Sequence, residues 1–527
     1  MALSSITPSA CAPATFPTPT LFGADFLSLE VVQVTNYSSE VVEGSTFGSP
    51  AVDLVDANFC NITVSYTHPG QKDIIHVETW LPTDTWNGKF NAVGGGGFNA
   101  GRYPMTYSSM AGALGNGYAT VTTDAGLGFG SEVNSLLWLL ASPGNLNLYS
   151  LQNLASASLI DEALIAKTFI RNYYSQDPSR SYWTGCSQGG RQGLMLAQRY
   201  PDVYDGIIAA APGLNWAGVM IGLIWPTIYM EETNQHPHLC EVSQLTALAV
   251  SECDALDGVE DGIIANPAAC RRVFDPFAHV GTEFECASIG ENATTIRNIS
   301  EAAAAVADAT WTGPVAAAGE PTYLHGVDIG TDLTSVVATD CSGDGQCSSF
   351  NAALVQIVIR GFYEKDPASN TTSVSFGELK RIYHRLSQEL ASSLGTNDPD
   401  LSEFREAGGK MITFQGLADP TIPANLTLNY YRDVLEGQPD AHDFYRIFPI
   451  PGMGHCGSQL GEPAAQPESL FAQLRLWVEN GTAPESTSYV VKLPDNSTQE
   501  QLSCPYPAKA VFNPSAADGS SGWSCAS

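Results

Sequence analysis

Basic residues are scarce in this chain. It has 23 Lys and Arg against 55 Asp and Glu, which gives a formal net charge of −32 at pH 7. A surface with this charge repels phosphate backbones and anionic lipid headgroups, so the sequence argues against nucleic acid or an anionic membrane as a partner. The same charge disfavours polyanionic substrates at neutral pH. The oligomeric state is left open by the sequence.

Long apolar runs are missing as well. The longest, residues 216–225, has ten residues, whereas a helix that crosses a bilayer needs about 20. A basic start followed by a long apolar run is absent from residues 1–5, so no cleavable signal is visible there. We therefore interpret the chain as a mature form with an added Met1.

Cysteines and glycosylation sequons are plentiful instead. The chain has 12 cysteines, an even number with no CxxC pair, and eight Asn-x-Ser/Thr sequons. The sequons begin at Asn36, Asn61, Asn292, Asn298, Asn370, Asn425, Asn480 and Asn496. One sequon arises easily by chance, but eight beside twelve cysteines are typical of an oxidising, secreted context. We expect a secreted, extracellular glycoprotein with disulfide bonds.

Strands alternate with helices in the two outer parts of the chain. Short apolar or β-branched runs predict strands at residues 61–66, 74–80, 90–93, 118–123, 182–184, 206–210, 410–414 and 445–448. Helices are predicted at residues 151–174, 190–199 and 470–479. This alternation favours an α/β fold whose mostly parallel sheet is covered on both faces.

The regular β/α order lapses in the middle of the chain. The chain of 527 residues is too long for one ordinary compact core. The irregular stretch holds several cysteines and three sequons, and it includes an Ala-rich segment at residues 301–310. We interpret residues 214–395 as an inserted lid domain, and residues 1–213 with 396–527 as the catalytic domain that carries it.

A Gly-Cys-Ser-Gln-Gly motif occupies residues 185–189, after a predicted strand and before a predicted helix. The Gly-x-Ser-x-Gly pattern alone is common, but this context is the one that a nucleophile elbow requires. The sharp turn leaves little room for side chains, lifts the Ser187 oxygen above the sheet and leaves the N–H of Gln188 to bind an oxyanion. The alternative is a glycine-rich turn with an ordinary serine.

Two cysteines link this motif to a distant histidine. Cys186 precedes Ser187, and Cys456 follows His455. A disulfide between them would need their Cα atoms within roughly 4.4–6.8 Å, which would bring Ser187 and His455 together. Because a serine needs an adjacent base to be a useful nucleophile, this pairing predicts a serine hydrolase whose nucleophile and base are joined through their neighbours.

An aspartate completes the arrangement. Asp419 lies just after the predicted strand at residues 410–414, and the chain order Ser187, Asp419, His455 is that of α/β-hydrolases. Asp419 would hold His455 in the correct tautomer and stabilise the imidazolium. Three other aspartates are alternatives that do not follow a strand in this way: Asp433, Asp440 and Asp443.

Four consecutive glycines, residues 94–97, follow the predicted strand at 90–93. Backbone N–H groups approach a tetrahedral oxygen closely only where no Cβ intervenes. We expect Gly96 or Gly97 to supply the second oxyanion donor beside Gln188. The alternative is a flexible turn.

An acidic segment lies in the predicted lid. Residues 253–263 hold three aspartates and two glycines, and a bridge between Cys253 and Cys270 would close the segment. Carboxylates and backbone carbonyls are the ligands of Ca²⁺, although the EF-hand spacing is absent. A calcium ion in the lid would have a structural role; the alternative is a solvated acidic turn.

Two other groups of residues have weaker interpretations. His236, His238 and Cys240 resemble a transition-metal site only superficially, because in a secreted chain Cys240 belongs in a disulfide. Three aromatic residues at the lid entry would line an acyl pocket or belong to the lid core: Trp216, Trp225 and Tyr229.

Together these residues resemble the tannase/feruloyl esterase family of secreted, mainly fungal, α/β-hydrolases. The family's hallmark is a Cys-Ser, Asp, His-Cys arrangement, which residues 186–187, Asp419 and residues 455–456 match. The likeness continues in five further segments, so that it covers nearly the whole chain: residues 86–90, 183–193, 204–208, 253–263 and 504–507. The residue after the nucleophile, Gln188, departs from the family, which leaves its backbone role unchanged.

The resemblance implies a calcium site and a set of disulfides. The implied ligands are the side chains of Asp254, Asp257 and Asp261 with the carbonyls of Val259 and Ile263. The implied bridges are Cys11–Cys60, Cys186–Cys456, Cys253–Cys270 and Cys504–Cys525. Cys240, Cys286, Cys341 and Cys347 are left with three possible pairings.

The family divides by substrate, and the resemblance favours one side. Feruloyl esterases cleave hydroxycinnamate esters from plant cell-wall polysaccharide, and tannases cleave galloyl esters. The lid is fairly short and has no long insertion with a processing site, so we expect a feruloyl esterase, with a tannase as the alternative. A non-catalytic binding protein on a hydrolase scaffold is the rival from another class.

Overall fold

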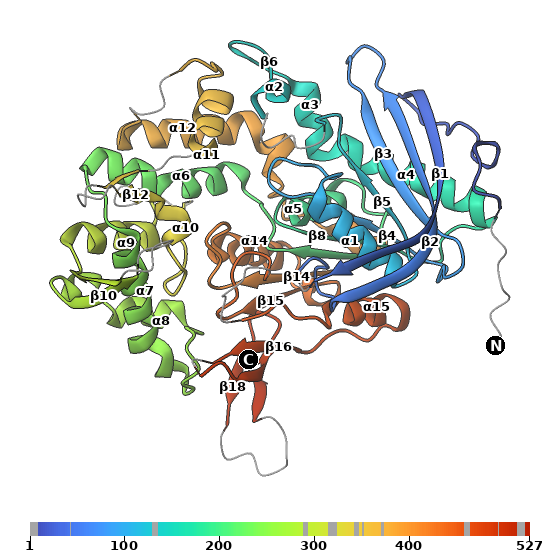
Figure 1. Ribbon diagram of the computed structural model, residues 1–527. Coiled ribbons are helices and arrows are strands. Elements are labelled where there is room, and N and C mark those ends of the chain that lie inside the picture. Colours follow the sequence, from blue (N-terminus) through green and yellow to red (C-terminus); the bar gives the residue numbers. More distant parts are fainter. Residues whose placement is uncertain are drawn as a thin grey trace.

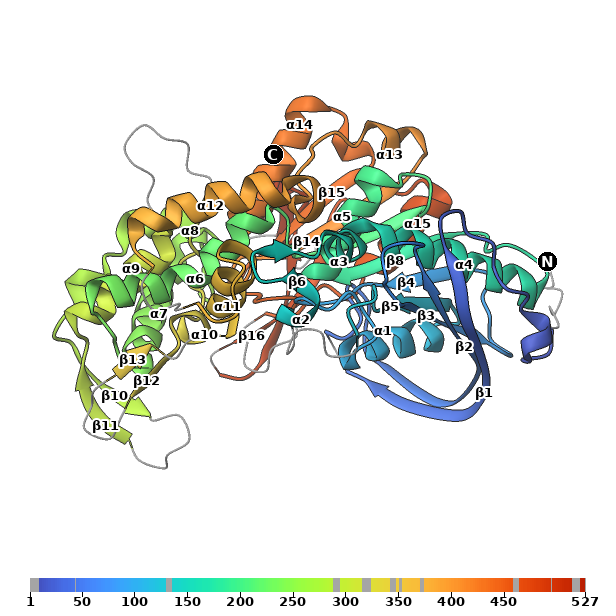
Figure 2. The same ribbon diagram turned by 90° about the horizontal axis from the view of Figure 1, so that it is seen from above.

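The computed structural model describes residues 9–42, 44–128, 135–287, 294–314, 324–341, 347–349, 353–369, 374–457, 464–493, 495–513 and 522–526. A large twisted sheet with its helices forms one half of the molecule, and a mainly helical insertion lies beside it (Figure 1). The view from above shows the same two parts side by side (Figure 2).

The sheet has nine strands in the order β1-β2-β3-β5-β4-β8-β9-β14-β15. Strands β1 to β3 and β5 pair antiparallel, and pairing from β5 through β15 is parallel. The strands are β1 (Asp25–Val41), β2 (Val52–Thr67), β3 (Ile75–Pro82), β4 (Phe90–Val93), β5 (Ala119–Thr123), β8 (Ser181–Cys186), β9 (Gly206–Ala210), β14 (Lys410–Gly416) and β15 (Tyr445–Ile450). The parallel half places the carboxyl ends of β4, β8, β14 and β15 along one edge, where sites form in such sheets.

Helices cover both faces of this sheet. Successive residues of a strand point to opposite faces, and on β8 the side chain of Tyr182 shares a core with Phe471, whereas Trp183 shares another with Leu194. One face therefore packs against α1 (Pro104–Gly115) and α15 (Leu470–Asn480). The other packs against α4 (Ser158–Tyr174), α5 (Gln188–Arg199) and α14 (Ala424–Gly437).

The insertion between β9 and β14 has a core of its own, in which Val242, Val306 and Trp311 are buried together. Ile221 and Ile382 of the insertion instead join the main core, so the division at residues 214 and 395 stays a prediction. Its elements are α6 (Trp216–Thr233), α7 (Leu239–Cys253), α8 (Pro267–Val273), β10 (Glu283–Ala287), β11 (Thr294–Asn298), α9 (Glu301–Thr312), α10 (Thr334–Val337), β12 (Thr339–Cys341), β13 (Cys347–Ser349), α11 (Ala353–Gln356) and α12 (Phe376–Leu390).

Smaller elements complete the fold. They are α2 (Ser135–Leu139), β6 (Leu140–Ser142), β7 (Asn145–Leu146), α3 (Leu148–Gln152), α13 (Ser402–Glu406), β16 (Thr487–Lys492), β17 (Thr498–Ser503), β18 (Lys509–Phe512) and β19 (Trp523–Ala526). The single helix predicted at residues 151–174 is wrong in one respect: a π-helical turn at Asn153–Ala157 separates α3 from α4. The carbonyls of Leu154 and Ala155 in this turn accept hydrogen bonds from Arg191, which lies outside the helix.

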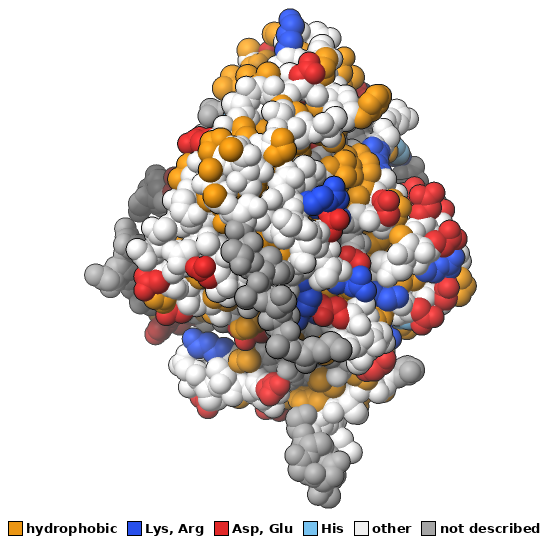
Figure 3. Space-filling model, turned by 90° about the vertical axis from the view of Figure 1, so that its right-hand side faces the viewer, with side chains coloured by type: hydrophobic (Ala, Val, Ile, Leu, Met, Phe, Trp, Pro, Cys, Tyr) orange, Lys and Arg blue, Asp and Glu red, His pale blue; other side chains and the backbone are white. Residues whose placement is uncertain are grey.

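All twelve cysteines form disulfides: Cys11–Cys60, Cys186–Cys456, Cys240–Cys286, Cys253–Cys270, Cys341–Cys347 and Cys504–Cys525. The four bridges that the resemblance implies are all present, and the two open pairings are resolved. Within the described ranges, no helix combines the length and the apolar character needed to cross a membrane. Acidic and basic side chains lie side by side on the face shown in Figure 3.

A buried polar cluster fastens α4 to the end of β2. The Nδ1 atom of His68 lies 2.7 Å from Asp73, and its Nε2 atom lies 3.1 Å from Asp161 on α4. The hydroxyl of Tyr66 donates to the same Asp161 carboxylate at 2.9 Å. Hydrogen bonding to Asp161 and Asp73, opposed by burial, raises the pKa of His68 from 6.5 to about 9.

This raised pKa predicts a loss of stability in alkali. Because the folded-state pKa of His68 exceeds its unfolded value, the stabilisation is complete below pH 6.5 and disappears as the pH rises through about 9. We expect the loss to be about 1–2 kcal/mol, since the ring is partly exposed. Thermal melts of the wild type and of His68→Gln across this range test it. A variant that loses as much stability as the wild type would show that another group titrates.

Candidate active site

Ser187 lies at a strained turn between β8 and α5. Its φ and ψ are 61° and −118°, a backbone conformation that residues other than glycine rarely adopt. The neighbouring glycines let the turn pack closely: a Cβ added at Gly185 would lie 2.6 Å from the backbone of Gly189, and one at Gly190 would lie 2.2 Å from the carbonyl oxygen of Ala210. The turn therefore has the geometry of a nucleophile elbow.

Asp419 and His455 form a hydrogen-bonded pair at the neighbouring strand ends. Asp419 follows β14 and His455 follows β15. The Nδ1 atom of His455 lies 3.0 and 2.9 Å from the two carboxylate oxygens of Asp419. The backbone N–H groups of Thr421 and Ile422 also donate to Asp419, at 2.8 and 2.9 Å. This pairing fixes the histidine ring by one nitrogen, so that the other can exchange protons.

The disulfide Cys186–Cys456 joins the two halves of the site. The Cα atoms of the two cysteines are 5.9 Å apart, although 270 positions separate them in the sequence. Ser187 and His455 flank this one bridge, as the sequence predicts. The structure thus brings together Ser187, Asp419 and His455.

Gln415 is a site residue that the sequence analysis missed. Its side chain is fully buried, and its Nε2 atom donates to Asp419 at 3.1 Å. The hydroxyl of Thr427 donates to the Gln415 carbonyl oxygen at 2.9 Å, which fixes the orientation of the amide. Gln415 therefore holds the aspartate from the side of the sheet. A buried amide in a central strand, four positions before the aspartate, is the signal that could have found it.

The glycine loop packs against the elbow. A Cβ added at Gly189 would lie 2.9 Å from the carbonyl oxygen of Gly95. The N–H of Gly94 donates to the carbonyl of Thr184, and that of Gly95 donates to the side chain of Gln192, both at 2.9 Å. The N–H groups of Gly94 and Gly95 are therefore already used in hydrogen bonds within the protein. Gly96 pairs with Asn99 in an isolated β-bridge, and the oxyanion role of Gly96 and Gly97 stays a prediction.

A buried arginine secures the start of α5. Arg191 donates to the side chain of Gln188 at 2.8 Å and to the carbonyls of Leu154 and Ala155 at 3.0 and 3.1 Å. Burial lowers the pKa of Arg191 to about 9. The partners are neutral, so their role is to hold the guanidinium in place rather than to neutralise it. This network ties the residue after the nucleophile to the π-helical turn.

Aromatic side chains gather next to the glycine loop. Phe98, directly after Gly97, has ring centroids of Trp216 and Phe362 at 6.2 Å and of Trp138 at 6.5 Å. Of the three aromatic residues at the lid entry, Trp216 alone joins this cluster. Trp225 and Tyr229 instead pack against Phe376 of the lid. A buried cluster of aromatic side chains thus lies beside the glycine loop.

The acidic segment folds into a closed turn. Both oxygens of Asp254 accept hydrogen bonds, from the N–H groups of Asp261 and Gly262 at 3.0 and 2.9 Å. Burial raises the pKa of Asp261 to about 6, and the charges of Asp254 and Asp257 contribute. Carboxylates are the ligand type that a hard cation prefers.

The spacing of the ligand atoms is a stricter test. Among the described residues, only His238, Cys240 and Cys286 offer three metal-ligand atoms within 4.8 Å of one another. The two cysteines are disulfide-bonded, so that group binds no transition metal. The three aspartates fit Ca²⁺ by donor type, but their carboxylates are spread more widely and would have to close around the ion.

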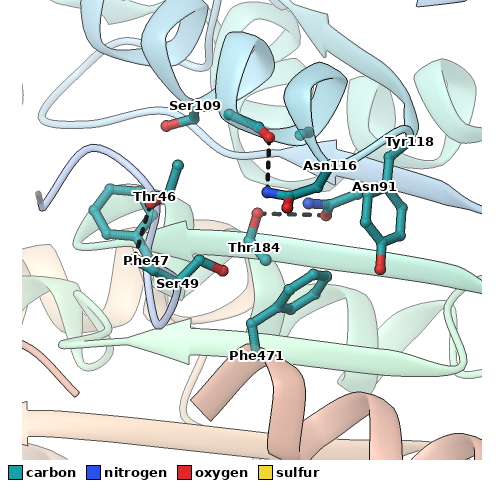
Figure 4. A pocket seen from close by; sticks show the side chains of 11 residues that line it. Thr46, Phe47, Ser49, Asn91, Ser109, Asn116, Tyr118, Thr184 and Phe471 are labelled. Carbon is teal, nitrogen blue, oxygen red and sulfur yellow. Dashed lines mark hydrogen bonds between the residues drawn. The ribbon is translucent and has the colours of Figure 1, made fainter. Parts of the chain in front are cut away.

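A small cavity lies on the face of the sheet opposite to α5, between β4, β8, α1 and α15 (Figure 4). Its volume is about 20 Å³, enough for a single water. Thr184 and Asn91 face each other there, joined by a hydrogen bond of 3.3 Å. The cavity is too small for an aromatic acyl group and does not extend the site.

A strained turn with a serine at the carboxyl end of a central parallel strand, followed by an aspartate and a histidine after two later strands, is the arrangement typical of the α/β-hydrolase class. The particular family follows from comparison with known proteins. The family model described as "Tannase and feruloyl esterase" matches residues 60–526. The chain belongs to this family, and it is an esterase.

Individual relatives agree with this assignment. A probable feruloyl esterase of Arthroderma benhamiae is 33% identical over 474 residues, which are 89% of this chain and 84% of that protein. A tannase of Aspergillus oryzae is 26% identical over 551 residues, 96% of this chain and 90% of that protein. The structure of a tannin acyl hydrolase from Aspergillus niger superposes with a TM-score of 0.87 at 26% identity, covering 99% of this chain and 96% of that chain.

Proposed function

We propose that this esterase hydrolyses hydroxycinnamoyl esters, such as feruloyl groups on plant cell-wall polysaccharide. The observation that carries the proposal is the aromatic cluster of Phe98, Trp138, Trp216 and Phe362 beside the glycine loop. All four side chains are buried and largely apolar, which suits contact with the aromatic ring of a hydroxycinnamate. The 33% identity to a probable feruloyl esterase supports the same substrate class.

The proposed mechanism is a two-step acyl transfer. The oxygen of Ser187 attacks the ester carbonyl while His455 takes its proton, and His455 then passes this proton to the leaving alcohol. Water activated by His455 next cleaves the acyl-enzyme. The N–H of Gln188 and that of Gly96 or Gly97 hold the oxyanion, each donor being worth roughly 10²–10³ in rate. Asp419, fixed by Gln415, stabilises the imidazolium.

Hydrolysis of galloyl esters is the second candidate, and it too has a specific observation in its favour. The tannin acyl hydrolase from Aspergillus niger shares the architecture of this chain over 99% of its length. A galloyl group carries three hydroxyls, whose recognition needs buried polar partners. The cluster beside the glycine loop is apolar, which is why the first candidate is preferred.

Initial rates on methyl ferulate and methyl gallate, measured side by side, test the choice. Faster cleavage of ferulate supports the proposal, and faster cleavage of gallate replaces it with the second candidate. Trp216→Ala should lower the ferulate rate more than the rate on a short aliphatic ester, with Trp225→Ala, whose ring packs against Phe376 instead, as the matched control. Equal losses on both esters in Trp216→Ala would contradict the role of the cluster.

We also propose that the protein is secreted and glycosylated, as its six disulfides indicate. Four sequon asparagines are exposed: Asn36, Asn298, Asn480 and Asn496. The amide of Asn61 donates to Glu78 at 3.0 Å, and that of Asn425 donates to Asp328 at 3.3 Å, both in partly buried positions. Asn292 and Asn370 lie outside the described residues.

The difference in exposure between these asparagines predicts which sequons carry glycans. After expression in a secreting eukaryotic host, we expect occupancy at the four exposed positions and little at Asn61 and Asn425, because a glycan there would break a partly buried contact. Peptide mapping after enzymatic deglycosylation in heavy water measures occupancy at each site. Full occupancy at Asn61 in folded, active protein would contradict the assignment.

We propose that the acidic turn binds a structural calcium ion. The side chains of Asp254, Asp257 and Asp261, with the carbonyls of Val259 and Ile263, would hold it. Burial, together with the charges of Asp254 and Asp257, raises the pKa of Asp261, and a cation would relieve this effect. When bound, the ion supplies charge neutralisation that stiffens the turn.

Calcium should therefore raise the melting temperature. Saturating calcium stabilises by about 2.7 kcal/mol at a hundredfold excess over Kd, and the effect should vanish in Asp257→Asn. Melts of chelator-treated protein with and without added calcium measure it, and magnesium serves as the control ion. Equal melting temperatures with and without calcium would contradict the proposed calcium site.

A further inference from the structure

The loop that carries His455 rests on three supports, of which two come from the catalytic machinery itself. One is the disulfide from Cys456 to the elbow. The second is the turn after β14, where the N–H of Ala418 donates to the carbonyl of Met453 at 3.0 Å. A Cβ added at Gly416 would lie 2.2 Å from the same carbonyl oxygen, so the contact is close.

The third support comes from the insertion. A Cβ added at Gly452 would lie only 2.5 Å from Cγ2 of Ile263, the last residue of the acidic turn. Ile263 is buried in the core that also contains Met453 and Cys456, which lie two positions before and one position after His455. Gly452 has a φ of 69°, so both its conformation and this contact require glycine. The acidic turn thus touches the histidine loop directly.

The acidic turn is itself anchored to the body of the protein. Its Asp261 is buried and accepts a hydrogen bond of 2.5 Å from the side chain of Gln501 on β17. The hydroxyl of Tyr489 on β16 donates to Gln501 at 2.9 Å. Asp261 also accepts from the N–H of Ile263 at 3.2 Å. Ile263 is therefore held from behind, and it can resist displacement of the loop.

We infer that Ile263 is a positioning residue for His455, so that the acidic turn acts on catalysis as well as on the stability of the insertion. The inference rests on the proposed catalytic role of His455. A cavity beside Gly452 would let the loop shift, and a displacement of about 1 Å in a reacting group lowers the rate roughly 100-fold. Substrate binding by the aromatic cluster would be unaffected.

The next residue offers a matched control. Ile264 is as buried as Ile263, but it belongs to the core of the insertion, where its Cδ1 atom would lie 3.1 Å from a Cβ added at Gly330. Ile263→Ala and Ile264→Ala remove the same atoms from neighbouring positions. Both should lower the melting temperature, but only the first should disturb the histidine.

The experiment compares the wild type, Ile263→Ala, Ile263→Val and Ile264→Ala, with excess calcium present throughout and well below each melting temperature. We expect Ile263→Ala to lower kcat by about tenfold to 100-fold with KM within twofold. The rate of fluorophosphonate labelling at Ser187 should fall in parallel. Ile263→Val should recover most of both rates, and Ile264→Ala should leave both within twofold of the wild type.

Two outcomes would overturn the inference: Ile263→Ala that retains kcat, or Ile264→Ala that loses as much. If Ile263→Ala does not fold, the comparison of Ile263→Leu with Ile264→Leu decides in the same way, because leucine keeps the size of the side chain but lacks the Cγ2 atom that faces Gly452. Labelling reports activation of Ser187 whatever the natural ester. A wild type that is labelled but inactive on ferulate therefore counts against the proposed substrate alone, and an unlabelled wild type counts against the catalytic serine.

Discussion

Ser187→Ala is expected to abolish ester hydrolysis and to leave the fold intact. The oxygen of Ser187 forms the covalent intermediate, so its removal should lower kcat by roughly 10⁴-fold or more. Alanine retains the Cβ atom, so the strained turn and its contacts with Gly185 and Gly189 are unchanged. Initial rates on an aromatic ester, together with thermal melts of both proteins, measure the two parts of the prediction.

Ser181→Ala supplies the matched control for this change. Ser181 is buried at the other end of the same strand, β8, so its substitution tests the loss of a strand hydroxyl away from the site. It should retain most of the wild-type rate and lose covalent labelling by a fluorophosphonate only slightly. Substantial turnover in Ser187→Ala would show that another residue is the nucleophile.

The sequence predicted the Cys186–Cys456 bridge and the pairing of Asp419 with His455 because these parts are defined by local chemistry. The elbow needs glycines at fixed positions around Ser187, and a buried strand before it, and both are visible in the sequence. The order of Ser187, Asp419 and His455 then restricts the fold. Cys186 and Cys456 add a long-range restraint that single sequences rarely contain. Because each cysteine is next to a reactive residue, their pairing would bring Ser187 and His455 together.

Elements were missed where tertiary contacts decide the structure. The 17-residue edge strand β1 is largely exposed, and its alternation loses register at the adjacent Val31 and Val32, so the pattern does not predict a strand of this length. The π-helical turn at 153–157 forms where Arg191 takes two carbonyls, and the local sequence contains no sign of Arg191. Gln415 and Ile263 look like ordinary strand and turn residues, and their roles depend on Asp419 and Gly452, which lie near them only after folding.

Removing the Cys186–Cys456 bridge is expected to have the second large effect. A crosslink that closes a loop of 270 residues lowers the entropy of the unfolded chain, which stabilises the folded protein by about 5 kcal/mol. The same bridge sets the separation of Ser187 and His455. The double variant Cys186→Ala/Cys456→Ala should therefore lose stability, and it should also lose roughly 100-fold in kcat because the base moves from its partner.

Cys11→Ala/Cys60→Ala separates these two effects, because that bridge joins the start of the chain to β2 and does not touch the site. It should lower the melting temperature and leave kcat near the wild-type value. If both double variants lose stability and retain kcat, the loop contacts of Ala418 and Ile263 are sufficient to hold His455. Loss of kcat in Cys186→Ala/Cys456→Ala alone would mean that packing cannot replace the covalent link. In that case each of the three supports is needed to hold His455 in place.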